Sequence, residues 1–192
     1  MPSEKNGLPV LSFATQAEFA AWLADNAETG GLWIRIAKKG TGIPSVDHDQ
    51  ALAVALRHGW IDGQANRVDD EYYLQRFTPR TKRSRWSKIN RAAAERLIEA
   101  GEMTPRGLRE VEAAKADGRW EAAYAGPAAS TVPDDLRAAL DANPAAAAFF
   151  ETLTSQNRYA ILYRVEEAKR PETRARRVEK FVAMLARGET LH

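Results

Sequence analysis

The pattern of the sequence changes near residue 86, and this change most restricts the folds that the chain can adopt. Before it, short segments with alternating apolar residues stand between helical segments. The alternation is clearest over residues 32–38, where Leu32, Ile34 and Ile36 share one side of a predicted strand. After residue 86 only helical spacing is found. The sequence therefore predicts an α+β fold, with a mixed α/β N-terminal part containing a small sheet, followed by an all-helical C-terminal module.

A stretch rich in alanine, glycine, proline, serine and threonine suggests a boundary between two domains. It covers residues 124–132 and is predicted to be a linker. The preceding domain, residues 8–123, is expected to contain strands near residues 32–38, 60–64 and 71–78. Residues 133–190, in which prolines open several helical segments, are predicted to form a helical C-terminal domain.

Short polar residues mark the predicted helix starts. Their side chains can accept a hydrogen bond from an amide in the first turn, which otherwise has no partner within the helix. The predicted starts are marked by Thr15, Asp47, Ser87, Thr104, Asn143 and Ser155.

The composition excludes several kinds of site. The chain has no cysteine, which excludes disulfides, thiolate nucleophiles, iron–sulfur clusters and cysteine-ligated zinc and suits a reducing compartment. No apolar run approaches the roughly 20 residues of a transmembrane helix, and residues 1–13 lack the apolar core of a signal peptide. We therefore expect a cytoplasmic protein without a membrane span.

The strongest local feature is a basic segment at residues 76–91. It contains seven basic residues and no acidic one. The whole chain is nearly balanced, with 28 lysines and arginines against 26 aspartates and glutamates. Such a segment, leading into the start of a helix, suits an anionic ligand, either a small molecule or a nucleic acid. The candidate ligand-binding residues in it are Arg76, Arg80, Arg83, Arg85, Trp86 and Asn90. Alternatively, the segment is a solvated surface loop whose arginines pair with Asp69, Asp70 and Glu71.

A second candidate is the segment GWIDG at residues 59–63. A partly buried Asp62 beside Trp60 could serve as an acid or base, with Trp60 as the wall of a pocket. The flanking glycines equally suit a structural turn, with Trp60 in the core.

Other site signatures are missing. Asp47, His48 and Asp49 offer metal-capable side chains, and His58 follows ten positions after His48, but no ligand spacing is recognisable, so no metal is expected. The sequence lacks GxGxxG, the GK[ST] of a phosphate-binding loop and GxSxG, so we expect neither a nucleotide cofactor nor a serine hydrolase.

Several motifs together resemble the bacterial YdeI/OmpD-associated, or bacteriocin-protection, family. They are GLWIRIAKKGTGIPS (31–45), HGWIDGQ (58–64), LQRFTPR (74–80), SRWSKINR (84–91), AKADGRW (114–120) and SQNRYAILYRV (155–165). The resemblance runs over roughly residues 12–190. It implies a bacterial cytosolic protein linked to envelope stress or to tolerance of antimicrobial peptides, and it supplies no catalytic residues.

Three functional hypotheses follow. The first is a non-catalytic protein that binds an anionic ligand or partner through the basic segment, with Trp60 and Asp62 nearby. The second is a small-molecule enzyme in which Asp62 is the acid or base and the arginines position an anionic substrate. The third is a module that binds a protein partner through its C-terminal helices.

Overall fold

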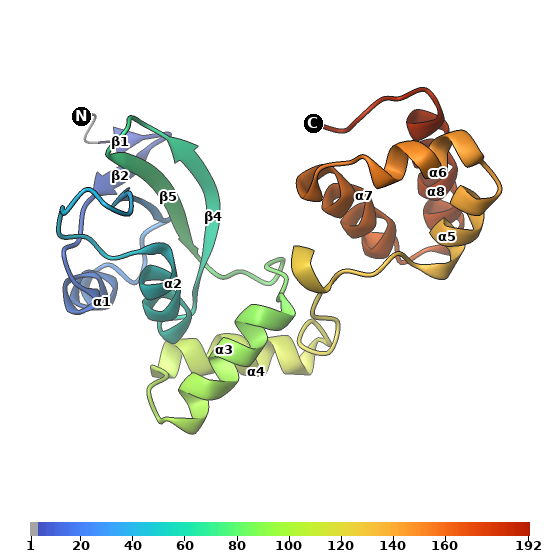
Figure 1. The fold of residues 1–192 in the computed structure, drawn as a ribbon. Coiled ribbons are helices and arrows are strands. Elements are labelled where there is room, and N and C mark those ends of the chain that lie inside the picture. The colour runs from blue at the N-terminus through green and yellow to red at the C-terminus, as the bar shows by residue number, and fades with distance from the viewer. Residues whose placement is uncertain (1–3) are drawn as a thin grey trace. The chain divides into compact units, whose positions relative to one another are not determined.

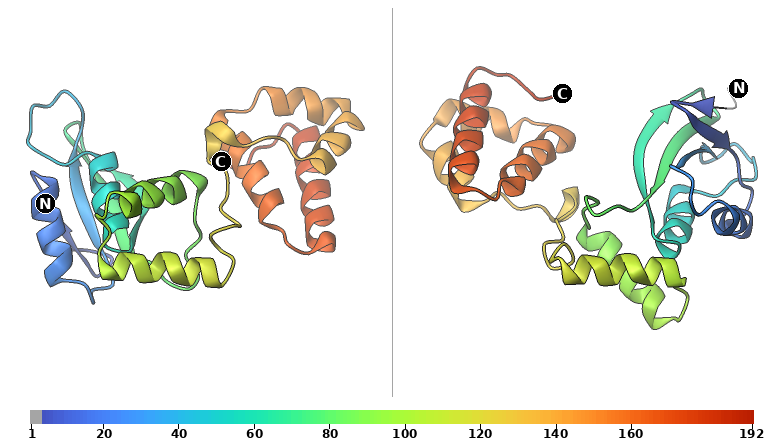
Figure 2. Two further views of the ribbon diagram at one scale, coloured as in Figure 1. Left: turned by 90° about the horizontal axis from the view of Figure 1, so that it is seen from below. Right: turned by 180° about the vertical axis from the view of Figure 1, so that it is seen from behind.

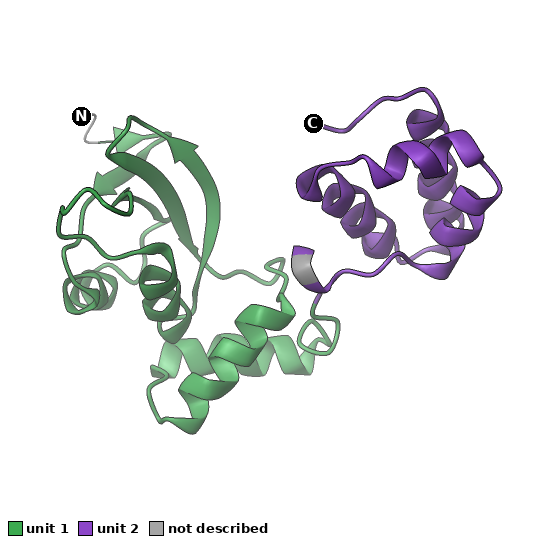
Figure 3. Cartoon of the chain, in the orientation of Figure 1, with its two compact units in different colours: residues 1–123 green, residues 124–192 purple. Residues whose placement is uncertain are grey.

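The computed structural model describes residues 4–192, apart from the side chain of residue 128. Residues 1–3, the beginning of the stretch inspected for a signal peptide, lie outside the described part. The chain forms two compact units, residues 1–123 (unit 1) and 124–192 (unit 2), which are coloured separately in Figure 3. The fold-class prediction is confirmed, because unit 1 contains a mixed five-stranded sheet with helices and the main elements of unit 2 are helices.

The sheet of unit 1 has the strand order β1-β2-β3-β5-β4. Its strands are β1 (Glu4–Lys5), β2 (Leu8–Leu11), β3 (Leu32–Ala37), β4 (Trp60–Arg67) and β5 (Tyr72–Pro79). Strands β2 and β3 are parallel, whereas β3 pairs with β5, and β5 with β4, in antiparallel fashion. The pairing of β4 with β5 is shifted by a bulge between Asp62 and Ala65.

Two helices cover one face of this sheet, α1 (Gln16–Asp25) and α2 (His48–Arg57), as Figure 1 shows. Alternate residues of β3 point toward them because successive side chains of a strand face opposite sides. The resulting core is built from aromatic and branched side chains. It includes Phe19, Leu23, Leu32, Ile34, Ile36, Val54, Trp60 and Phe77.

A second core of unit 1 lies between α2 and the helices α3 (Lys88–Glu99) and α4 (Pro105–Ala116). Trp86 and Trp120 meet edge to face in it, with ring centroids 4.7 Å apart. The segment that follows β5 is therefore anchored by a buried tryptophan.

Unit 2 has its own hydrophobic core, made by α5 (Asp134–Asp141), α6 (Pro144–Glu151), α7 (Ser155–Glu167) and α8 (Pro171–Ala186). A short 3-10 helix, η1 (Pro127–Ala129), precedes them within the stretch predicted as a linker. In the described part of the chain, no helix combines the length and apolarity that crossing a membrane requires.

Most predicted helix starts carry the expected side-chain caps. A side-chain oxygen accepts a hydrogen bond from the amide three residues ahead at Thr15, Asp47, Ser87, Thr104 and Asn143. The prediction for Ser155 is wrong by one residue: Thr154 caps α7 through the amide of Asn157, and Ser155 is the first helical residue.

Candidate functional site

The basic residues of segment 76–91 do not form one cluster in the structure. Arg76 lies in strand β5. Arg91 lies in α3, where its guanidinium contacts Glu95 at 3.0 Å. Arg80 is buried. The remaining four lie in or after the turn at residues 81–84 and are Lys82, Arg83, Arg85 and Lys88.

Arg80 and Trp86 form a stacked pair at the base of this turn. The guanidinium carbon of Arg80 lies 3.5 Å from the centroid of the Trp86 ring, and Nη1 donates to the carbonyl of Arg85 at 3.2 Å. Arg80 is 5% exposed and Trp86 is 1% exposed. The pair therefore anchors the segment, and its exposed surface is too small to hold a ligand.

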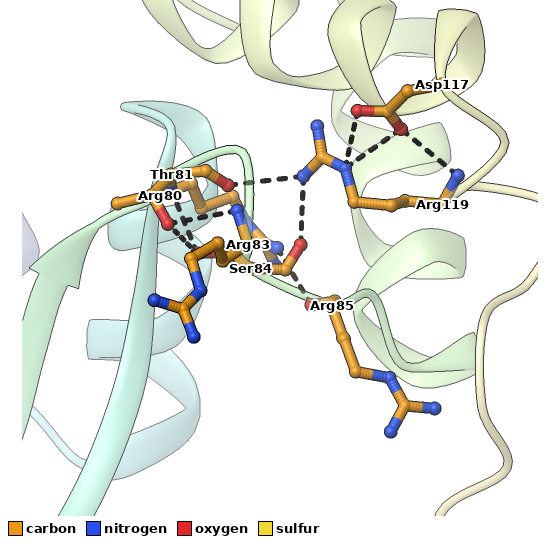
Figure 4. A network of polar contacts seen from close by, with 7 residues as sticks. All are labelled: Arg80, Thr81, Arg83, Ser84, Arg85, Asp117 and Arg119. Carbon is orange, nitrogen blue, oxygen red and sulfur yellow. Dashed lines mark hydrogen bonds and ion pairs between the residues drawn. The ribbon is translucent and has the colours of Figure 1, made fainter. Parts of the chain in front are cut away.

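A second arginine, Arg119, holds the turn from the segment after α4 (Figure 4). Its Nη1 donates to the carbonyls of Ser84 and Thr81 at 2.9 and 3.3 Å, and its Nε lies 2.8 and 2.9 Å from the carboxylate oxygens of Asp117. Slight burial opposes a fall in the pKa of Asp117, but the hydrogen bonds from Arg119 outweigh it and lower that pKa. The turn is thus fixed by a guanidinium whose charge is neutralised locally.

The turn itself presents cations to solvent. Lys82 and Arg83 are exposed, and in Figure 4 the side chain of Arg83 extends away from Arg119. Lys88 is also exposed, in the first turn of α3. Within residues 4–192, no ion pair joins any of these three side chains to a carboxylate. A fixed backbone therefore carries cations that no carboxylate of the described residues neutralises by direct contact.

Two of the three acids proposed as surface partners of the segment have other roles. One carboxylate oxygen of Asp69 accepts hydrogen bonds from the amides of Glu71 and Tyr72, at 2.9 and 2.7 Å. Asp70 lies 3.3 Å from Arg67 at the end of β4. Within the described residues, these acids form no ion pair with the segment.

Asn90, the last candidate of this segment, is largely buried in the first turn of α3. Its backbone amide donates to the hydroxyl of Ser87 at 3.1 Å, which caps the helix. The structure therefore brings Arg80, Arg83, Arg85, Trp86 and Asn90 together around the turn and the start of α3, whereas Arg76 lies on the sheet.

Trp60 and Asp62 belong to a different region. Trp60 is fully buried in the core beside the sheet, with its ring 6.2 Å from that of Trp22. Asp62 lies within β4 at the bulge and not in a tight turn. Its carboxylate is 3.2 Å from Nε2 of His48, the first residue of α2.

His48 lines a cavity of about 350 Å³ beside the sheet. Its other ring nitrogen, Nδ1, is 3.3 Å from Asp49, so the imidazole lies between two carboxylates. The hydrogen bond to Asp62 raises the pKa of His48, burial opposes this, and the contact with Asp49 adds to it. The cavity is lined by Ile36, Ala37, Lys38, Lys39, Asp47, His48, Asp49 and Tyr73.

This arrangement does not form a metal site. Asp49 and Asp62 lie at opposite nitrogens of the ring, which suits a protonated imidazolium, whereas a metal-binding histidine is neutral. In the part of the chain that the structure describes, no group of three or more histidine, cysteine, aspartate or glutamate residues could hold a metal ion.

Sequence reasoning missed two contacts. Arg119 stands in the motif AKADGRW. A lone arginine after a glycine does not indicate that it donates hydrogen bonds to the carbonyls of Ser84 and Thr81, 35 and 38 residues earlier in the chain. His48 was weighed as a metal ligand, whereas its partner is Asp62, 14 positions away. Both contacts join distant segments and have no local signal.

Comparison with known families gives two matches. Residues 11–110 match the model described as a domain of unknown function (DUF8412), and residues 129–188 match the model described as bacteriocin-protection, YdeI or OmpD-associated. No curated protein and no solved structure matches the chain.

The two matches fall on different units. The bacteriocin-protection model lies within unit 2, and the other model within unit 1, although the sequence resemblance was expected over nearly the whole chain. The predicted family is thus confirmed, with its model confined to the C-terminal part. The chain belongs to the DUF8412 family through residues 11–110 and carries a bacteriocin-protection, YdeI or OmpD-associated domain at residues 129–188.

Proposed function

We propose that unit 1 is a non-catalytic module that recognises an anionic partner through the 81–84 turn and the start of α3. The observation that carries this proposal is a rigid turn whose exposed cations, Lys82 and Arg83, have no carboxylate partner among the described residues. Lys88 adds a third such cation. The proposal places this recognition in the cytoplasm, which suits a chain without cysteine.

The hydrogen bonds from Arg119 to the carbonyls of Thr81 and Ser84 support the proposal, because they lower the entropic cost of binding a partner. A loop that is already ordered loses less conformational freedom when a partner binds. The cations themselves are long and exposed, which suits an extended polyanion that loses counterions on contact. We therefore propose a nucleic acid, in preference to a small metabolite bound in a pocket, as the partner of this turn.

The test is a titration of fluorescently labelled single-stranded and duplex oligonucleotides over a range of salt concentrations. We expect the log–log slope of affinity against salt to fall by about two when Lys82→Gln and Arg83→Gln are combined. The matched control combines Arg176→Gln with Lys180→Gln, which removes the same charge from exposed positions of α8. Equal slopes for the two double variants, or no binding by the wild type at low salt, would refute the proposal.

The contact between His48 and Asp62 favours a second candidate, a small-molecule enzyme. Here His48, which lines the cavity, is the proton-transfer group and Asp62 positions it. This reverses the role first considered for Asp62. The test is a metabolite screen by thermal shift on wild type, His48→Asn and Asp62→Asn, because a bound ligand stabilises the folded state by mass action. If every stabilising ligand acts equally on all three proteins, this candidate fails.

A third candidate rests on the groove between α5 and α8 and on the family description of unit 2. The groove has a volume of about 760 Å³, and alanines and valines line much of it, including Ala139, Val178 and Val182. An apolar helix of a protein partner fits such a surface. We propose that protection against bacteriocins, which the family description names, depends on this unit.

This third candidate is tested by complementation. A bacterial strain that lacks the gene receives the full chain or a full chain with Ala139→Glu and Ala183→Glu, and its survival under bacteriocin challenge is compared. Loss of protection by a variant that still folds supports the groove. Full protection by that variant contradicts it.

A further inference from the structure

A second cationic site lies on the face of the sheet opposite α1 and α2. Leu32, Ile34 and Ile36 of β3 point into the core beneath those helices, so Trp33 and Arg35 point to the other face. The views in Figures 1 and 2 show no helix of unit 1 over that face.

The strand register brings two arginines together on this face. Arg76 of β5 pairs with Trp33, and Leu74 pairs with Arg35, so Arg35 and Arg76 are diagonal neighbours on adjacent strands. Such neighbours lie about 7–8 Å apart at the backbone, which lets two long side chains reach a common point. Leu74 is only 6% exposed, as expected if the aliphatic parts of the arginines lie across it.

Each arginine is held by its surroundings. The guanidinium carbon of Arg35 lies 3.5 Å from the centroid of the Tyr72 ring. Arg76 lies against Gly63 of β4, where an added Cβ would be 3.7 Å from Cβ of Arg76 and 3.9 Å from its Cδ. The ring of Tyr72 thus orients the guanidinium of Arg35 before any ligand arrives, and Gly63 leaves room for the stem of Arg76.

The two guanidiniums lack anionic partners within the described residues. Neither Arg35 nor Arg76 forms an ion pair there, and the Nε atom of each is buried without a hydrogen-bond acceptor. Lys5 adds a further positive charge, because its ammonium lies 4.8 Å from the centroid of the Trp33 ring.

Many other arginines of the described residues are paired with a carboxylate, although exposed ones such as Arg83 are not. Ion pairs with a carboxylate are made by Arg57, Arg67, Arg91, Arg106, Arg119, Arg158, Arg174, Arg177 and Arg187. Like charges that share one face repel each other, and an anion between them would relieve this repulsion.

We propose that Arg35 and Arg76 bind one oxyanion, a phosphate or a carboxylate, on the open face of the sheet. Two guanidiniums present fixed donor pairs that match an anion with two or more oxygens on one centre. The site lies on the sheet, uses none of the residues of the 81–84 turn, and goes beyond the function proposed for that turn.

The test follows the Nε–Hε signals of the arginines by NMR in the full chain. Inorganic phosphate and acetate are titrated separately against chloride at equal ionic strength. We expect saturable shifts at Arg35 and Arg76 with a Kd of about 1 mM or tighter for at least one of the two anions. The anion that saturates the signals identifies phosphate or carboxylate as the ligand group.

The variants Arg35→Lys and Arg76→Lys keep the charge and the stem but lose the planar fork. We expect each to bind at least about tenfold more weakly. Arg67→Lys, at the exposed end of β4, is the matched control and should leave binding unchanged, as should the Lys82→Gln and Arg83→Gln pair. Backbone spectra establish that each variant is folded.

Two results overturn the proposal. One is a change in the wild-type Nε–Hε signals that is linear in the concentration of both anions and equals the change caused by chloride. The other is unchanged affinity in the folded Arg35→Lys and Arg76→Lys variants. The anion titration tests only this site, and the oligonucleotide titration tests the turn. Failure of one proposal is therefore distinguished from failure of the other.

Discussion

At the scale of single residues, the two histidines of unit 1 respond to pH in opposite directions. The pKa of His48 is raised, chiefly by its hydrogen bond to Asp62, so its contribution to stability is full below the ordinary value of 6.5 and is lost as the pH rises through the folded-state value. We expect Asp62→Asn to lower the free energy of unfolding more at pH 5.5 than at pH 8. The difference should be below about 1 kcal/mol because the pair is partly exposed. Urea unfolding at the two pH values measures it.

His58 provides the control for this prediction. Burial lowers its pKa, and Arg57 and Arg106 lower it further, so its contribution to stability is present above 6.5 and is lost as the pH falls through the folded-state value. Glutamine cannot be protonated, so His58→Gln removes this loss, and the stability of the variant relative to the wild type should be higher at pH 5.5 than at pH 8. A loss for Asp62→Asn that is equal at both pH values would contradict the assigned role of His48.

Gly107 permits a close approach between α4 and the end of α2. A Cβ at this position would lie 2.3 Å from the carbonyl oxygen of Arg57 and 2.8 Å from Cε of Met103. Alanine favours a helix over glycine by about 1 kcal/mol, yet we expect Gly107→Ala to destabilise unit 1 by about 2 kcal/mol, because backbone must move. Denaturant unfolding gives the value.

The matched control is Gly101→Ala, because an added Cβ there meets nothing within 4 Å and only the φ of +68° opposes it. This variant should lose about 1 kcal/mol. If Gly107→Ala is as stable as the wild type, the two helices are not in such close contact in solution.

At the scale of elements, the 81–84 turn depends on a residue far along the chain. Arg119→Ala removes the donor to the carbonyls of Thr81 and Ser84. Loss of about 1.4 kcal/mol of local stability corresponds to tenfold more frequent opening. We therefore expect about tenfold faster tryptic cleavage after Lys82 and Arg83 in the native protein.

Asp117→Asn is the control, since it removes the charge partner of Arg119 and leaves the bonds to the two carbonyls in place. Its cleavage rate should lie nearer to that of the wild type. Equal rates for Arg119→Ala and wild type would show that the turn is held by other contacts, such as the stack of Arg80 on Trp86.

The helices and strands also show which parts of the fold can be predicted from the sequence. The caps at Thr15, Ser87 and Thr104 were predicted from sequence because each bond spans only three residues. The bulge between Asp62 and Ala65 was not predicted, because it depends on how β4 pairs with β5. A strand near residues 60–64 was predicted, although the glycines around Asp62 also suited a turn, and pairing with β5 extends β4 to Arg67.

At the scale of the whole molecule, we expect unit 2 to fold without unit 1. Its helices enclose a separate core that includes Leu136, Phe150, Ile161 and Phe181. A fragment of residues 124–192 should show a helical circular dichroism spectrum and a cooperative thermal melt. A spectrum without helix, or a melt without cooperativity, would show that unit 2 needs the rest of the chain.

The sequence by itself determined which kinds of element form and where many of them begin, because periodicity and capping act within a few residues. It also excluded cysteine chemistry. Only the tertiary structure decided which cations have no carboxylate partner among the residues that it describes. Arg80 is stacked beneath a turn and Arg76 lies beside Arg35 on a sheet face, although both stand in one basic run. Strand register and contacts such as those of Arg119 join residues dozens of positions apart, so local pattern carries no signal of them.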